Sequence, residues 1–503
     1  MKIKWKNLLL GVIGALFLSL TMVVLFPKDY DLYIVGFFIL SSLSILTMIW
    51  LFRWAGGERF LAIIVSLAFL LRFGVGLFFT QALPLVGYPE EAQQAGYLFA
   101  DAYQRDTQAW ELAASDSSIF SAFSGETFFS DQYGGLLALS AVVYRVFSPG
   151  IHFKANILLL MAFMSTLTIL FMWKALKQQS TFIQKTVVFL IAFYPDIILY
   201  SASEMREGII LGLSAILFYL VNKPTLKNLK TVIISLFVIF ALILINLKVA
   251  IFIVFAIGVW YLLFNNQDFS FIKSKRWLTI LIILGVIGIG LFSVQWLAKS
   301  SQWDSALLVM ESGWVETIIH QIGKRYRLPF ATMYGFFRPL LPAAIIETSI
   351  PIWKITTIIR SISWYMVMPV LLYGFVFGIR TFKKDKGKHL IFWVLIMVWI
   401  LLSSLRAGGD QWDNPRYRIN LFVLIAVYLA ETLDYLILHK DHWFTRIVIA
   451  IFVFIAFFLY WYINRYINTF AQINFYIMVG LILISAVTLF ISGLIHEYRI
   501  QKK

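Results

Sequence analysis

The chain has 503 residues, of which 61% are apolar, 17% aromatic and only 14% charged, and its mean hydropathy is +0.84. So much apolar surface does not fit inside water-soluble domains, which excludes a soluble protein and makes the lipid bilayer the expected partner. The sequence contains no cysteine, which excludes disulfides, thiolate nucleophiles and cysteine metal sites.

A membrane helix needs about 20 largely apolar residues, and about 14 segments (12–14) approach that length. The sequence therefore predicts an all-α, polytopic integral membrane protein. The predicted spans, in chain order, are residues 8–26, 31–52, 60–79, 155–173, 186–200, 206–221, 231–246, 249–264, 277–297, 360–379, 390–405, 416–438, 446–464 and 473–495.

The net charge of +16 has a topological explanation. With the N-terminus inside, the short inner loops are rich in Lys and Arg and most carboxylates lie outside, as the positive-inside rule requires. We therefore expect a multi-pass protein of the plasma membrane with both termini in the cytoplasm. The same distribution argues against nucleic acid as a partner.

Two predicted outer loops are long, residues 80–154 and 298–359, and every predicted inner loop is short. The chain is accordingly divided into two extra N-terminal spans (1–59), a core with the first long loop (60–264) and a C-terminal membrane region with the second (265–503). Because functional residues gather on loops, we expect the chemistry on the extracytoplasmic side.

The first long loop carries an acidic, helix-compatible stretch with Asp101, Asp106 and Trp110. Further on, an apolar run at about residues 134–143 is too short to span and is flanked by Tyr144 and Arg145, which predicts a helix lying in the membrane interface.

A second candidate site is the short outer turn after Pro195, where Glu204, Arg206 and Glu207 follow. Ionisable groups at membrane depth are usually functional. Basic residues near other outer span ends, Lys248, Arg416 and Arg418, are candidates for binding a phosphate.

Each candidate also has a structural explanation. Asp106 is compatible with a solvated helix face, the two glutamates with helix capping, and the arginines with interfacial anchoring. The six histidines, His152 among them, show no metal-ligand spacing and are expected to be structural or solvated. No protein metal site and no cofactor is predicted, and a role for a divalent ion stays open.

In this order and sidedness, the motifs resemble the GT-C superfamily of membrane glycosyltransferases, in particular the branch of protein O-mannosyltransferases and the aminoarabinose transferase of lipid A. The family pattern D-x-x-x-[YW]-x-x-A fits Asp106 to Ala113, with Asp101 as a competing register. The run from Asp131 to Arg145 is similar to the family's interfacial helix. Other matching segments are the outer turn with Pro195, Ser201, Ser203, Glu204 and Glu207, and the later Asn414-Pro415-Arg416-Tyr417-Arg418.

The resemblance implies a GT-C-like fold and an inverting transfer of sugar from a polyprenyl-phosphate donor to a saccharide, lipid or protein acceptor. It implies that Asp106 or Asp101 is the general base, with Glu204 and Glu207 orienting the acceptor, pairing with Arg206 or sharing a metal. Arg206, Lys248, Arg416, Tyr417 and Arg418 would bind the phosphate group.

Two departures from the family pattern stand out: two spans precede its usual first span, and the opening acid is not the usual pair. The alternative functions are a polysaccharide polymerase, and a flippase or secondary transporter of lipid-linked saccharides. A flippase or secondary transporter is disfavoured because the two halves of the sequence show no evident repeat.

Overall fold

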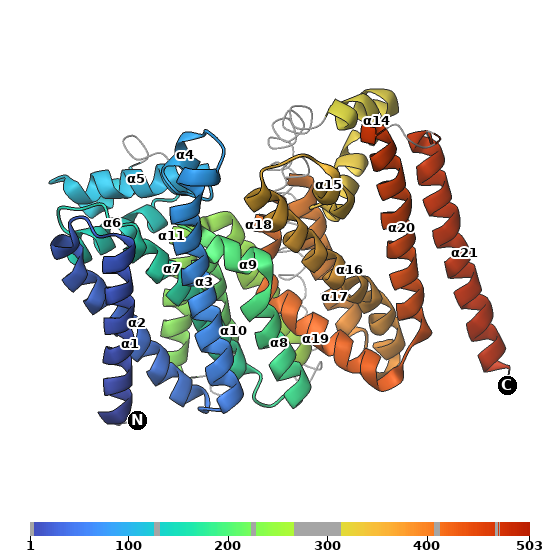
Figure 1. Ribbon diagram of the computed structural model, residues 1–503. Helices are drawn as coiled ribbons and strands as arrows, with labels where there is room; N and C mark the ends of the chain where they lie inside the picture. Colours follow the sequence, from blue (N-terminus) through green and yellow to red (C-terminus); the bar gives the residue numbers. More distant parts are fainter. Residues whose placement is uncertain are drawn as a thin grey trace. The chain divides into compact units, whose positions relative to one another are not determined.

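The computed structural model describes residues 5–124, 131–222, 228–265, 313–406, 413–467, 471 and 473–502. Within these residues the secondary structure is helical and contains no β-strand, as Figure 1 shows. The predicted all-α class is therefore confirmed for the described part of the chain. The chain divides into two compact units, Met1–Asn265 with Ile419–Ala426, and Asn266–Arg418 with Val427–Lys503.

The N-terminal unit contains long apolar helices and several short ones. They are α1 (Trp5–Leu25), α2 (Tyr30–Ala55), α3 (Arg59–Val86), α4 (Glu91–Gln94), α5 (Ala100–Ala114), the 3₁₀ helix η1 (Ile119–Phe123), α6 (Gly135–Phe147), α7 (Ala155–Ala175), α8 (Thr181–Phe193), α9 (Pro195–Ser201), α10 (Arg206–Val221), α11 (Leu229–Trp260) and the π-helix η2 (Tyr261–Asn265).

The C-terminal unit contains the remaining helices, except that the last residue of α18 and the first residues of α19 are assigned to the N-terminal unit. They are α14 (Gly313–Phe337), α15 (Leu341–Ile346), α16 (Pro351–Asp385), α17 (Lys388–Arg406), α18 (Asp413–Ile419), α19 (Phe422–His439), α20 (His442–Ile467) and α21 (Phe475–Gln501).

Among the described residues, ten helices are long and apolar enough to cross a membrane, or up to eleven if the pair α8 and α9, bent by 51°, forms one span. A polytopic membrane protein is thus supported, although the structure does not establish the predicted number of 14. The predicted span 277–297 lies outside the described residues. The predicted spans 231–246 and 249–264 both fall within α11.

Helix α11 is broken at Asn246, whose φ of −163° and ψ of 98° are not helical. The Asn246 side chain accepts a hydrogen bond from the Val249 amide at 3.2 Å, as the N-cap of a new helix does. Trp260, at the far end, donates to Asn222 at the end of α10. In a straight helix the two ends of α11, Leu229 and Trp260, would be roughly 48 Å apart. Trp260 nevertheless bonds to Asn222, only seven residues before Leu229, so the break at Asn246 folds α11 back on itself. The two halves correspond to the two spans predicted there.

Helices α8 and α9 are separated by the bend at Pro195. Proline has no amide hydrogen, so it cannot bond to the carbonyl of Ile191, four residues before it. The buried Arg72 of α3 donates to that carbonyl at 2.7 Å. The arginine inside a predicted span therefore satisfies a backbone group that the bend leaves free.

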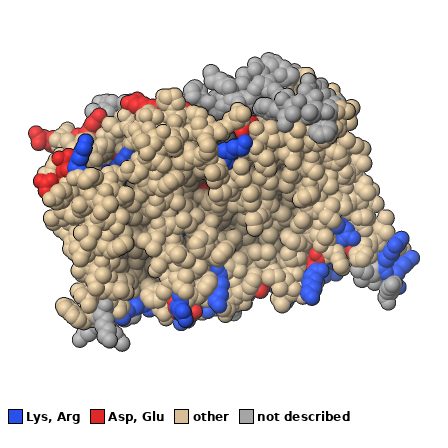
Figure 2. Space-filling model, viewed as in Figure 1, with Lys and Arg blue, Asp and Glu red and all other residues tan. Residues whose placement is uncertain are grey.

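On the face shown in Figure 2, the visible Lys, Arg, Asp and Glu side chains lie towards two opposite edges, and the broad surface between them is almost uniformly uncharged. Helices α20 and α21 bury only 17% and 11% of their most apolar stretch. Apolar surface of that extent is stable only against lipid or another protein. This arrangement is typical of helices that face a bilayer.

The ends of α2 and α7, which lead into two of the predicted inner loops, lie together at one end of the N-terminal unit. Lys174, in the last turn of α7, donates to the carbonyl of Trp54, in the last turn of α2, at 2.9 Å. Helix α6 lies at the opposite end, against the start of α2, where a Cβ on Gly36 would come within 1.6 Å of the Phe147 carbonyl oxygen. The short helices of the first long loop therefore form a layer across one end of this unit.

Candidate active site

Asp106 lies on the buried side of α5 and is 1% exposed. Asp101, five residues earlier, is solvent-exposed in the first turn of the same helix. Five residues correspond to about 140° around a helix, so the two carboxylates cannot share one face. Trp110, one turn after Asp106, stays on its side and contacts the Tyr144 ring with centroids 5.6 Å apart.

Three donors from separate segments surround the Asp106 carboxylate. The hydroxyls of Tyr97 and Tyr144 donate to Oδ2 and Oδ1, each at 2.5 Å, and His152 Nε2 lies 2.9 Å from Oδ2. Burial alone would raise the pKa of Asp106, but the bonds to His152, Tyr144 and Tyr97 outweigh it and hold the pKa below its usual value. Asp106 is therefore a carboxylate ion at neutral pH.

Glu204, in the turn between α9 and α10, is 2% exposed and accepts a hydrogen bond from the Ser140 hydroxyl of α6. Burial, followed by the negative charge of Asp106, raises the pKa of Glu204 well above its usual value, and the nearby Arg105 only partly offsets this. Two neighbouring buried carboxyl groups cannot both ionise easily. The site thus combines one carboxyl group whose pKa is lowered with a neighbour whose pKa is raised.

These two groups line one pocket of about 330 Å³, measured out to its open mouth. Lys154, just before α7, supplies its positive charge. Its ammonium donates to the Ala95 carbonyl at 2.5 Å and lies 4.7 Å from the centre of the Tyr97 ring. Burial lowers the pKa of Lys154 to about 8, although the charge of Asp106 acts in the opposite direction. The full lining is Gly76, Phe79, Thr80, Gly96, Tyr97, Leu98, Asp106, Lys154, Ile157, Leu158, Ala202, Ser203 and Glu204.

Arg206, predicted to bind phosphate or pair with a glutamate, forms a buried ion pair with Asp131. Asp131 also accepts hydrogen bonds from the amides of Leu136 and Leu137, each at 3.0 Å, and so caps the start of α6. This pair joins the start of α6 to the start of α10. Glu207 is buried in the first turn of α10 and is not part of the pocket lining.

The other predicted phosphate ligands do not line this pocket. Lys248 lies just after the break in α11 and is half-buried. Arg416, Tyr417 and Arg418 belong to α18 and to the C-terminal unit. Arg418 stacks on Trp364, with its guanidinium carbon 3.6 Å from the ring centre.

Sequence reasoning missed four residues of the site: Tyr97, Tyr144, His152 and Lys154. The expectation that His152 is merely structural or solvated overlooked its pairing with Asp106, from which it is 46 residues distant in sequence. Its ring also stacks on Trp110, at 5.5 Å and an interplanar angle of 4°. The sequence does place Trp110 one turn after Asp106, on the same side of the helix. It does not indicate which histidine contacts the Trp110 ring.

Among the described residues, no group of three or more His, Asp and Glu side chains is arranged to hold a metal ion. Comparison of the chain with protein-family models, curated proteins and solved structures gives no match. The function of this chain is therefore inferred from the chemistry of the pocket.

Proposed function

We propose that this protein is a membrane glycosyltransferase of GT-C type. It transfers a sugar from a polyprenyl-phosphate donor to an acceptor hydroxyl on the extracytoplasmic side. The observation that carries the proposal is the meeting of Asp106 and Lys154 in one pocket beside Glu204, because a base and a cation are the groups that such a transfer requires.

In the proposed reaction the acceptor oxygen attacks the anomeric carbon of the donor sugar while Asp106 takes the acceptor proton. The bond from the anomeric carbon to the phosphate oxygen breaks, and its electron pair leaves with the polyprenyl phosphate. Lys154 stabilises the charge that develops on this leaving group. Attack opposite the leaving group inverts the configuration at the anomeric carbon.

The surroundings of Asp106 suit a base that has to return its proton. Its partner His152 has a side chain that is 29% exposed, so a hydrogen-bonded path leads from the buried carboxylate to the solvent. The raised pKa of Glu204 favours its neutral form, which does not repel the donor phosphate.

The test is sugar transfer by purified protein in lipid nanodiscs, using radiolabelled polyprenyl-phosphate monosaccharides as donors and membrane extracts as acceptors. Asp106→Asn keeps the size of the side chain but cannot take a proton, so we expect the rate to fall by about 10²- to 10⁴-fold. Asp101→Asn, on the exposed side of the same helix, is the matched control and should retain activity.

Thermal unfolding of each variant establishes that it is folded. The proposal fails if folded wild-type protein transfers none of the labelled sugars, or if Asp106→Asn is as active as wild type. Movement of intact lipid-linked saccharide across vesicle membranes without transfer would instead identify a transporter.

A further inference from the structure

The C-terminal unit has a shallow pocket of its own, of about 350 Å³ measured out into the open solvent, which the proposed reaction does not use. It lies where the end of α14, helix α15, the start of α16 and the end of α20 meet. Its lining consists of Tyr334, Arg338, Pro339, Leu340, Ala343, Ala344, Glu347, Thr357 and Tyr462.

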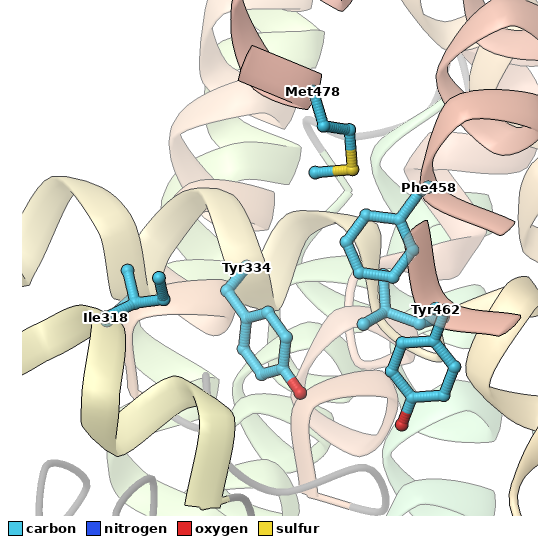
Figure 3. Close-up of a cluster of buried hydrophobic side chains, with 7 residues drawn as sticks. Ile318, Tyr334, Phe458, Tyr462 and Met478 are labelled. Atoms are coloured by element: carbon cyan, nitrogen blue, oxygen red, sulfur yellow. The ribbon is translucent and has the colours of Figure 1, made fainter. Parts of the chain in front are cut away.

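An apolar cluster supports this pocket from one side. Its buried members include Ile318, Phe458 and Met478, together with the rings of Tyr334 and Tyr462. Figure 3 shows that the hydroxyls of both tyrosines point the same way, away from Met478. Each tyrosine therefore contributes its ring to the apolar cluster and its hydroxyl to the pocket.

The polar groups of the pocket are held by contacts with one another. Arg338 donates to the Tyr334 hydroxyl at 2.9 Å and lies 4.8 Å above the centre of the same ring. Across the pocket, the buried Tyr462 donates its hydroxyl to the carboxylate of Glu347, which is otherwise exposed. One positive and one negative side chain are thus fixed beside two aromatic hydroxyls.

Arg418 fixes the backbone on which this arrangement depends. It is 3% exposed and donates to the carbonyl of Arg338 at 2.8 Å. Its stacking on Trp364 restricts the guanidinium further. Arg418 is therefore a positioning residue for Arg338.

We propose that this pocket is a saccharide-binding subsite. A sugar ring has apolar C–H faces and many hydroxyls that both donate and accept hydrogen bonds. Arg338 and Thr357 supply donors, Glu347 supplies acceptors, and the tyrosines supply both together with apolar ring surface.

The charges distinguish a saccharide from an anion. A phosphate would be attracted by Arg338 and repelled by Glu347, so the pair favours a neutral polyhydroxylated ligand. This inference goes beyond the proposed transfer, and it is tested by binding in the absence of any lipid-linked donor. Its outcome is therefore independent of whether Asp106 is catalytic.

The experiment measures binding of free glucose, galactose, mannose, N-acetylglucosamine and their disaccharides to the full-length protein by saturation-transfer NMR. We expect at least one to bind, and Glu347→Gln or Tyr462→Phe to weaken it by about tenfold or more, because each removes a hydrogen bond to a charged group. Tyr460→Phe is the matched control, since Tyr460 lies on the same helix but donates to the Ala471 carbonyl at 3.0 Å.

Binding that is lost with Glu347→Gln and Tyr462→Phe but kept with Tyr460→Phe supports the proposal. It is overturned if no saccharide binds, if the pocket variants bind as wild type does, or if inorganic phosphate displaces the saccharide from wild type but not from Arg338→Ala. The last result would identify an anion site. The thermal unfolding midpoints of the variants verify that a loss of binding is not a loss of fold.

Discussion

Lys154 is the residue whose charge state is most sensitive to its surroundings in the proposed active site. Its ammonium is held between the Ala95 carbonyl and the Tyr97 ring, and burial lowers its pKa to about 8. The charged form of a lysine exists below its pKa. The cation is therefore present at neutral pH and is lost as the pH rises through about 8.

This predicts a limit to transfer on the alkaline side. If Lys154 stabilises the leaving phosphate, activity should fall as the pH rises through about 8. Lys154→Arg, which stays protonated, should move this fall to higher pH, and Lys154→Met should reduce the rate at every pH. The alkaline fall in activity is measured as the rate of sugar transfer at values between about pH 6 and 10. An alkaline fall identical in wild type and Lys154→Arg would assign it to another group.

At the scale of elements, helix α6 connects the parts of the site. It carries Tyr144, which donates to Asp106, and Ser140, which donates to Glu204. Asp131 caps α6 and pairs with Arg206 of α10, and both side chains of this pair are buried. The orientation of the two carboxyl groups therefore depends on how this short helix is anchored.

Removing Asp131 should release that anchor. Asp131→Ala deprives α6 of its cap and leaves Arg206 buried without its partner, which costs about 3–5 kcal/mol for a broken buried pair. Unfolding followed in mixed micelles should show this loss, whereas Asp116→Ala, at an exposed site of the same loop, should leave stability unchanged. Equal stability of the two variants would mean that the pair does not hold α6.

At the scale of the whole molecule, the orientation in the membrane decides whether the pocket of Asp106 faces the donor. The chain has no cysteine, so a single introduced cysteine reports its own accessibility. We predict that a membrane-impermeant maleimide labels Ser117→Cys in intact cells, because positive-inside orientation puts the first long loop outside. Lys177→Cys, exposed in a predicted inner loop, should react only after permeabilisation. The reverse pattern would place the pocket on the cytoplasmic side and contradict the proposed reaction.

Much of the framework could be predicted from sequence because its cause is local. Apolar length determines which segments can cross a bilayer, and the run before Tyr144 was too short to span and is the 13-residue helix α6. The break in α11 occurs where a polar Asn246 and Lys248 interrupt apolar sequence. The choice between Asp101 and Asp106 needed the structure, since a helical pattern gives two faces without saying which one is covered.

The sequence by itself determined that this is a helical membrane protein with its candidate carboxyl groups in the segments between spans, because hydropathy and charge act residue by residue. Only the tertiary structure decided that Asp106 and Glu204 line one pocket, with Lys154 beside them. The donors to Asp106 are 9, 38 and 46 residues away along the chain. Burial and long-range contacts set the protonation of these groups, and neither is encoded in the local pattern of residues.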